Sequence, residues 1–132
     1  MRAMLQGLTA VLVLATAPVA FAAERLPPEA ELAKMLEGRT AGAPVDCITQ
    51  RLIASSRIID KTAIVYRLPG GVLYVNRPNG ADALDRDAIL VSKTIGDRLC
   101  RMDTVTLLDS GSHFMRGSVN LGAFIPYAKP RP

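Results

Sequence analysis

Two cysteines, Cys47 in "PVDCI" and Cys100 in "GDRLCRM", could do the most varied chemistry in this chain of 132 residues. The chain has no C-x-x-C motif for thiol–disulfide exchange. Two cysteines and the single histidine, His113, lack the paired ligand spacing of a zinc site. A Cys–His nucleophile would need one free thiol and would leave the other cysteine unpaired. Since two cysteines in one small exported domain most simply pair, we predict a structural Cys47–Cys100 disulfide.

The N-terminus supplies the argument for export. The stretch Met1–Ala22 reads MRAMLQGLTAVLVLATAPVAFA, with Arg2 as a positive start, an apolar run and an A-x-A cleavage site. This pattern is typical of a secretory signal peptide and predicts a periplasmic or secreted protein after cleavage near Ala22. The apolar run of roughly a dozen residues is shorter than the ~20 of a spanning helix, so we expect no transmembrane helix in the mature form. An uncleaved amphipathic anchor is the alternative.

His113 raises the possibility of nucleophilic catalysis, because Asp109, Ser110 and Ser112 precede it in "DSGSH". A Ser–His–Asp triad is defined by its geometry and not by adjacency in sequence, and no G-x-S-x-G elbow is present. A loop between two strands is the more ordinary setting for this histidine. The alternative function is therefore a small hydrolase or metal-dependent enzyme that uses His113 with Asp109 or Asp103.

Asp82, Asp85 and Asp87 in "GADALDRD" could offer oxygen ligands to calcium. Their spacing lacks the register of a calcium-binding loop, and turn aspartates usually hydrogen-bond to local backbone. We predict no metal, no other cofactor and no catalytic residue. Because loops on a rigid scaffold carry recognition, the candidate recognition surface consists of polar residues from two loops: Arg77, Asp82, Asp85, Asp87, Asp109 and His113.

Charge and aromatic content limit the partners. The chain has 16 basic and 12 acidic side chains, and the basic ones are scattered along it. With three tyrosines, three phenylalanines and no tryptophan, it lacks the interleaved aromatic and basic residues of a nucleic-acid platform. We expect no nucleic-acid partner. The function expected from the sequence is a non-catalytic binding or structural protein of the cell envelope, whose partner is an envelope protein or a glycan.

A short helix and linker are predicted for residues 23–44. Pro28 suits the first helical position, and two glutamates follow it at the positive end of the helix dipole. Leu32, Met35 and Leu36 form a narrow apolar stripe, and Gly38 can end the helix in a left-handed conformation. A helix this short must pack its apolar stripe on another element.

Residues 45–127 carry short β-branched runs separated by turn signals, which predicts one disulfide-stapled, mainly β domain. The expected architecture is a small antiparallel barrel, roll or sandwich with one short N-terminal helix. A hairpin is predicted between 62–68 and 71–76, and residues 128–132 are predicted to be a frayed tail. The run 57–68, "RIIDKTAIVYRL", is rich in β-branched residues and contains the first strand of this hairpin. The other predicted strand segments are 47–53, 88–93, 103–109 and 114–127, the last as a strand pair or an edge segment.

Five segments in order carry a resemblance to a known family: "DCI", "IIDKTAIVYR", "GGVLYVN", "LCRMDTV" and "LGAFIPY". Over residues 45–127 the chain resembles small exported proteobacterial proteins that are classed as a domain of unknown function. That family's pattern is Cys-Ile, Asp-x-Thr, Gly-Gly-x-x-Tyr-x-Asn, Leu-Cys-x-x-Asp and Leu-Gly-x-Phe-x-Pro. Its members often carry a second cysteine pair. Both of those cysteines are missing here, as expected if they bond to each other, and this supports Cys47–Cys100 as the retained bridge. The resemblance implies no activity, cofactor or catalytic residue.

Overall fold

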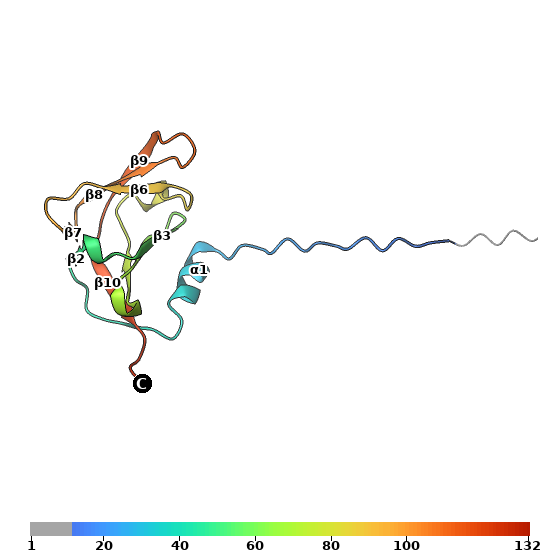
Figure 1. The fold of residues 1–132 in the computed structure, drawn as a ribbon, viewed down its shortest axis with the longest axis horizontal. Coiled ribbons are helices and arrows are strands. Elements are labelled where there is room, and N and C mark those ends of the chain that lie inside the picture. Colours follow the sequence, from blue (N-terminus) through green and yellow to red (C-terminus); the bar gives the residue numbers. More distant parts are fainter. Residues whose placement is uncertain (1–11) are drawn as a thin grey trace, which may run out of the picture.

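The computed structural model describes residues 12–132. Residues 12–27 are extended and almost wholly exposed, without helix or strand, and lead away from the folded body (Figure 1). The predicted signal peptide begins outside the described residues and stays a prediction. Within residues 12–132, no helix is long and apolar enough to cross a membrane.

The predicted helix is present as α1 (Pro28–Met35), which begins at the expected proline. Leu32 is buried, and Met35 and Leu36 pack beside it against the sheet. Gly38 follows the last turn with φ 72°, the left-handed conformation predicted for the end of the helix. The linker contains one feature that the sequence did not predict, a two-residue strand β1 (Thr40–Ala41) that pairs with the last strand.

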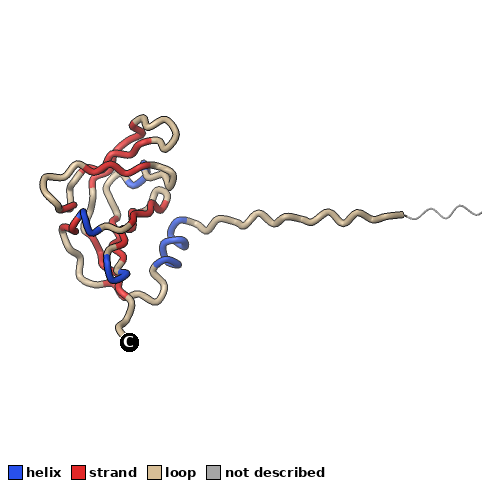
Figure 2. Tube along the Cα trace, viewed as in Figure 1, coloured by secondary structure: helices blue, strands red, loops and turns tan. Residues whose placement is uncertain are grey.

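The described chain is mainly β, as predicted, with ten strands in three antiparallel sheets (Figure 2). The sheets do not form a closed barrel within residues 12–132. In order across the five-stranded sheet lie β1, β10 (Phe124–Ala128), β5 (Leu73–Asn76), β4 (Ala63–Arg67) and β3 (Ser55–Ile59). The two-stranded sheet pairs β2 (Cys47–Thr49) with β7 (Arg98–Cys100), and the three-stranded sheet has the order β6 (Ile89–Ser92), β8 (Thr104–Leu108), β9 (Met115–Asn120). Three short 3-10 helices lie between strands: η1 (Gln50–Leu52), η2 (Pro69–Gly71) and η3 (Ala81–Ala83).

The five-stranded sheet is covered on both faces. One face packs against the other two sheets in a core that includes Ile64, Leu99 and Phe124. The other face packs against α1 through Leu32 and Val65. Strand β4 therefore reads as a continuous apolar run and not as an alternating one, because both of its faces are buried.

The predicted hairpin is confirmed, since β4 pairs antiparallel with β5 and the connection passes through η2. The sequence run 57–68, which contains the first hairpin strand, is divided in the structure between two strands, β3 and β4, joined by a tight turn at Asp60, Lys61 and Thr62. Lys61 has φ 52°, and the Thr62 hydroxyl donates a 2.8 Å hydrogen bond to the Asp60 carbonyl. Glycine and proline, the strongest turn signals, are missing from this turn, so the sequence did not reveal it.

Segment 114–127 forms two strands that belong to different sheets, β9 and β10. The chain crosses between them at Gly122, whose N–H donates to Asn76 Oδ1 (2.9 Å) and whose carbonyl accepts from Asn76 Nδ2 (2.8 Å). Asn76 is fully buried. A side chain at position 122 would place its Cβ 2.7 Å from the Arg77 carbonyl oxygen, so only glycine fits this crossing. Strand β10 ends at Ala128, one residue beyond the predicted boundary of the tail.

The Cys47–Cys100 disulfide is present, as predicted. The two residues lie directly opposite each other on β2 and β7, with their Cα atoms 4.0 Å apart. The N–H of Cys100 donates a 2.7 Å hydrogen bond to the Asp103 carboxylate. A loop closed over 53 residues stabilises the folded state by roughly 4 kcal/mol in the chain-entropy model.

Candidate functional site

A basic cleft of about 480 Å³ lies between α1, strand β3 and the loop before β6. Leu26 and Met35 form part of its apolar wall. Among the described residues that line it, Glu31 supplies the one carboxylate, and the cations are Arg25, Lys34, Arg57 and Arg86. The cleft therefore carries a positive excess and suits a ligand with carboxylate or phosphate groups.

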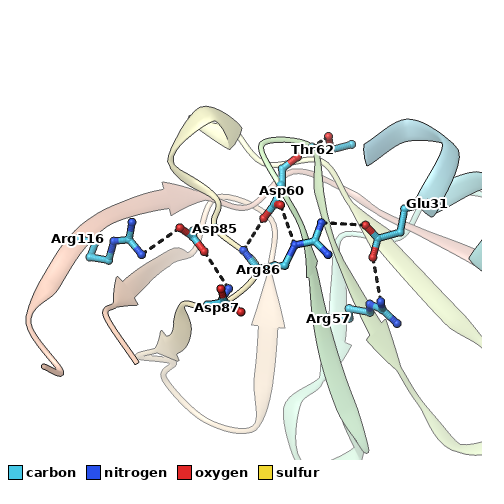
Figure 3. A network of polar contacts seen from close by, with 8 residues as sticks. All are labelled: Glu31, Arg57, Asp60, Thr62, Asp85, Arg86, Asp87 and Arg116. Carbon is cyan, nitrogen blue, oxygen red and sulfur yellow. Dashed lines mark hydrogen bonds and ion pairs between the residues drawn. The ribbon is translucent and has the colours of Figure 1, made fainter. Parts of the chain in front are cut away.

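Glu31 fixes two of the four cations. Helix α1 carries Glu31 in its first turn, where only 12% of its side chain is exposed. One carboxylate oxygen accepts from Arg57 at 2.9 Å and the other from Arg86 at 3.1 Å (Figure 3). The Glu31 carboxylate thus orients both guanidinium groups on the cleft wall.

Asp60 fixes Arg86 from the other side. Its carboxylate accepts from the Arg86 backbone N–H at 2.6 Å and from Arg86 Nε at 2.8 Å (Figure 3). Partial burial alone would raise the pKa of Asp60, but the hydrogen bonds and positive charge of Arg86 bring it below its ordinary value. The turn between β3 and β4 therefore positions the loop that carries Arg86.

Arg25 and Lys34 are the cations left without a partner. Both are exposed, and neither forms an ion pair within residues 12–132. Arg25 is close enough to Asp60 for its charge to contribute to the lowered pKa of that carboxyl. These two side chains are available to an incoming anion, while Arg57 and Arg86 are already oriented.

The structure brings part of the two predicted recognition loops together through Arg116 of β9. Its guanidinium lies 3.1 Å from Asp85 and 3.9 Å from Asp109 (Figure 3 shows the Asp85 pair). Asp85 also accepts a 2.9 Å hydrogen bond from the Asp87 backbone N–H. Asp82 is exposed in η3. Asp85 and Asp109 thus link the two loops through Arg116.

Arg77 lies apart from that cluster and belongs to the support of α1. Its guanidinium makes a two-pronged pair with Glu29, at 2.8 and 3.0 Å. The hydrogen bond from Arg77 lowers the pKa of Glu29. The pair joins the chain after β5 to the first turn of the helix and so helps to position the basic cleft.

Asp109 and His113 form the turn between β8 and β9. The Asp109 carboxylate accepts hydrogen bonds from the N–H and hydroxyl of Ser112 and from the N–H of Gly111, and these bonds lower the pKa of Asp109. His113 is exposed with φ 61°, and its N–H donates to the Asp109 carbonyl. Within the described chain, no hydrogen bond joins the His113 imidazole to Asp109 or Asp103.

Sequence reasoning missed the basic cleft. It treated Arg57 and Arg86 as scattered surface charge and gave Arg25 and Lys34 no role. These residues come from four separate segments of the chain, so no local spacing relates them. The one available signal was the amphipathic helix. A helix this short must pack on another element, and a cleft can form along the edge where the two meet.

Comparison of the chain with protein-family models, with curated proteins and with solved structures found no match. Among residues 12–132, no group of three or more His, Cys, Asp or Glu side chains could hold a metal ion. What the site can do is therefore argued from its own geometry.

Proposed function

We propose that this protein is an exported, non-catalytic binding domain whose basic cleft binds an anionic group of a cell-envelope component. The observation that carries the proposal is that four cations line one hollow. Arg57 and Arg86 are oriented by ion pairs, and Arg25 and Lys34 have no ion-pair partner within residues 12–132. Charge-assisted hydrogen bonds from such groups recognise carboxylates and phosphates.

Export is supported by three features. The Cys47–Cys100 disulfide suits an oxidising compartment. The stretch Met1–Ala22 has the pattern of a signal peptide. The resemblance to exported proteobacterial proteins points to the same compartment. Removal of the leader would leave the cleft close to the new N-terminus, because Arg25 lies three residues after Ala22.

A binding role is favoured over the hydrolase alternative by what the carboxylates do. Asp109 accepts hydrogen bonds from its own turn, and Asp103 accepts one from Cys100. His113 has no carboxylate partner for its ring within the described residues. A general base needs an orienting group in hydrogen-bond reach, and this arrangement supplies none to His113.

Anion binding is tested by titrating the disulfide-intact protein with tetraglutamate and with inorganic phosphate. We expect tetraglutamate binding that weakens as salt is raised, because Arg25, Lys34 and Arg57 are exposed. Lys34→Gln should weaken binding about two- to fivefold, the range of one exposed ion pair, and Arg25→Gln should act similarly.

The matched control is Lys93→Gln, which removes an equal charge from an exposed site that lines a different hollow. This variant should bind tetraglutamate as the unmodified protein does. If Lys34→Gln and Lys93→Gln weaken tetraglutamate binding equally, the effect comes from net charge alone and the proposal is contradicted. The absence of any anion binding would also contradict it.

A further inference from the structure

Two sheet edges face each other without pairing. Strand β3 is the last strand of the five-stranded sheet, and β6 is an outer strand of the three-stranded sheet. A hollow of about 380 Å³ lies between them, with Ser56 and Leu90 among its walls. A second hollow of about 240 Å³ shares Ser56 and Leu90 and extends to Gln50 and Ser92. Together they form one slot along β3 and β6, which we call the β3–β6 slot.

The slot is bridged at its ends and open in between. At one end, Arg86 bonds to Asp60, and the Lys61 N–H donates to the Leu84 carbonyl at 3.1 Å. At the other end, the Thr94 hydroxyl donates to Gln50 Oε1 at 2.6 Å. Within the described chain, no backbone hydrogen bond joins β3 to β6. Each strand therefore keeps a row of unpaired N–H and C=O groups on its facing edge.

The wall of the slot contains an unsatisfied polar group. Tyr66 lines the second hollow, and only 3% of this residue is exposed. Its hydroxyl is the one buried side-chain polar atom in residues 12–132 that has no hydrogen-bond partner. Such a group costs about 1–3 kcal/mol while it stays unpaired. A ligand that brings an acceptor to this position would remove that cost.

Charge distinguishes the two ends of the slot. Arg57 and Arg86 line both the first hollow and the basic cleft beside α1. The slot and the positive cleft thus share these two side chains as a common wall, while the middle of the slot is lined by serine, isoleucine and leucine side chains. A ligand that fills both would be extended, able to pair with strand edges, and acidic at one end.

We propose that the β3–β6 slot binds an extended peptide segment of an envelope protein, which adds as a strand between β3 and β6 and places acidic side chains in the basic cleft. The proposal rests on the proposed anion-binding function and names its ligand class. Strand β3 has five residues and β6 has four, so a segment of about five residues, near 17 Å long, would fill the slot. Main-chain hydrogen bonds to both edges would supply affinity, as in strand addition generally.

The test uses labelled six-residue peptides, EEVTVT and VTVTEE, which offer the acidic end in either strand direction. We expect one of the two to bind at least tenfold more tightly than its lysine counterpart, KKVTVT or VTVTKK. A version with proline in place of the central threonine should bind more weakly, because it cannot donate that backbone hydrogen bond. Hydrogen exchange should slow at amides of β3 and β6 and not at those of the edge strand β9.

Tyr66→Phe separates this inference from the proposed function. Loss of one hydrogen bond should weaken peptide binding about fivefold, while tetraglutamate binding stays unchanged because Tyr66 does not line the basic cleft. If no peptide binds better than tetraglutamate, the strand inference fails and the anion-binding function survives. If tetraglutamate also fails to bind, both fail.

Two further results would overturn the choice of occupant. Protection at β9 or β1 instead of β3 and β6 would place the peptide on another edge. A dimer in analytical ultracentrifugation that the peptide dissociates would show that a second copy of this chain fills the slot.

Discussion

Two pairs of neighbouring strands in this molecule differ in how their facing edges are joined. At β2 and β7, three residue pairs form a backbone ladder, the Cys47–Cys100 disulfide joins the strands, and Ile48 and Leu99 are buried. At β3 and β6, side chains and one loop contact bridge only the ends, and a slot remains between them. The first boundary uses the strongest available link, while the second leaves backbone groups unpaired.

That difference indicates where stability and recognition are located. An open sheet edge invites unwanted pairing, and proteins usually limit it with short strands and charged side chains. Both devices are present at the slot, because β3 and β6 are short and Arg57 and Arg86 stand at one end. Because the cleft at that end also carries the unpaired Arg25 and Lys34, we expect the slot to bind an acidic strand more tightly than a basic one. The following changes test the two boundaries in order of expected effect.

Removal of the disulfide should have the largest effect. The double variant Cys47→Ala with Cys100→Ala frees a loop closed over 53 residues, which should lower the free energy of unfolding by roughly 4 kcal/mol. For a domain of this size the Tm should then fall by more than ten degrees, measured by circular dichroism. As a control, thiol titration of the denatured unmodified protein should find no free thiol, and two titratable thiols would contradict the bridge.

The second largest effect is expected from removing the Glu31 carboxylate, which joins α1 to Arg57 and Arg86. Glu31→Gln removes the charge that holds Arg57 and Arg86, at a cost of about 2 kcal/mol for hydrogen bonds to charged groups. It should also tighten tetraglutamate binding, since the cleft loses its one negative side chain. Urea unfolding and titration measure the two effects. Glu37→Gln, on an exposed residue just after the helix, is the control, and equal behaviour of the two variants would contradict the role of Glu31.

The Asp60–Arg86 bridge should make stability depend on pH. The pKa of Asp60 is lowered from 3.8 in the folded protein, so its contribution is fully present above that value and is lost as pH falls through the lowered pKa. Unfolding free energies of the unmodified protein and Asp60→Asn should therefore differ most above pH 4 and converge in more acidic solution. A difference that stays constant down to pH 2 would show that the charge of Asp60 is not involved.

The local parts of this fold could be predicted from the sequence because their partners are close along the chain or sit in turns. The helix start at Pro28 and the hairpin through Pro69 and Gly70 followed from backbone preferences alone. The disulfide followed from cysteine count and compartment. The residues of the family-like pattern also have structural partners here, since Thr62 bonds to Asp60, Asn76 to Gly122 and Cys100 to Asp103. In this chain these three contacts hold a turn, a strand crossing and the strand that carries the disulfide.

The site could not be predicted, because it depends on contacts between distant segments. Arg86 meets Asp60 across 26 residues and Glu31 across 55. The order of strands in the sheets decides which strand edges stay unpaired, and the pattern of predicted strands does not determine that order. The two loops proposed for recognition do meet, because Arg116 pairs with both Asp85 and Asp109, and each of these aspartates also accepts hydrogen bonds from its own turn.

The smallest effect on stability is expected at Tyr66, and it tests the slot directly. Tyr66→Phe keeps the ring that lies 5.9 Å from that of Phe124 and removes only the unpaired hydroxyl. A buried hydroxyl without a partner stabilises nothing in the free protein, so its loss should change the free energy of unfolding by less than about 1 kcal/mol, or raise it. Tyr74→Phe, on a partly exposed neighbour in β5, is the matched control. If Tyr66→Phe instead lowers stability by about 2 kcal/mol in urea unfolding, the hydroxyl already has a partner in the free protein and offers no unpaired donor to a ligand in the β3–β6 slot.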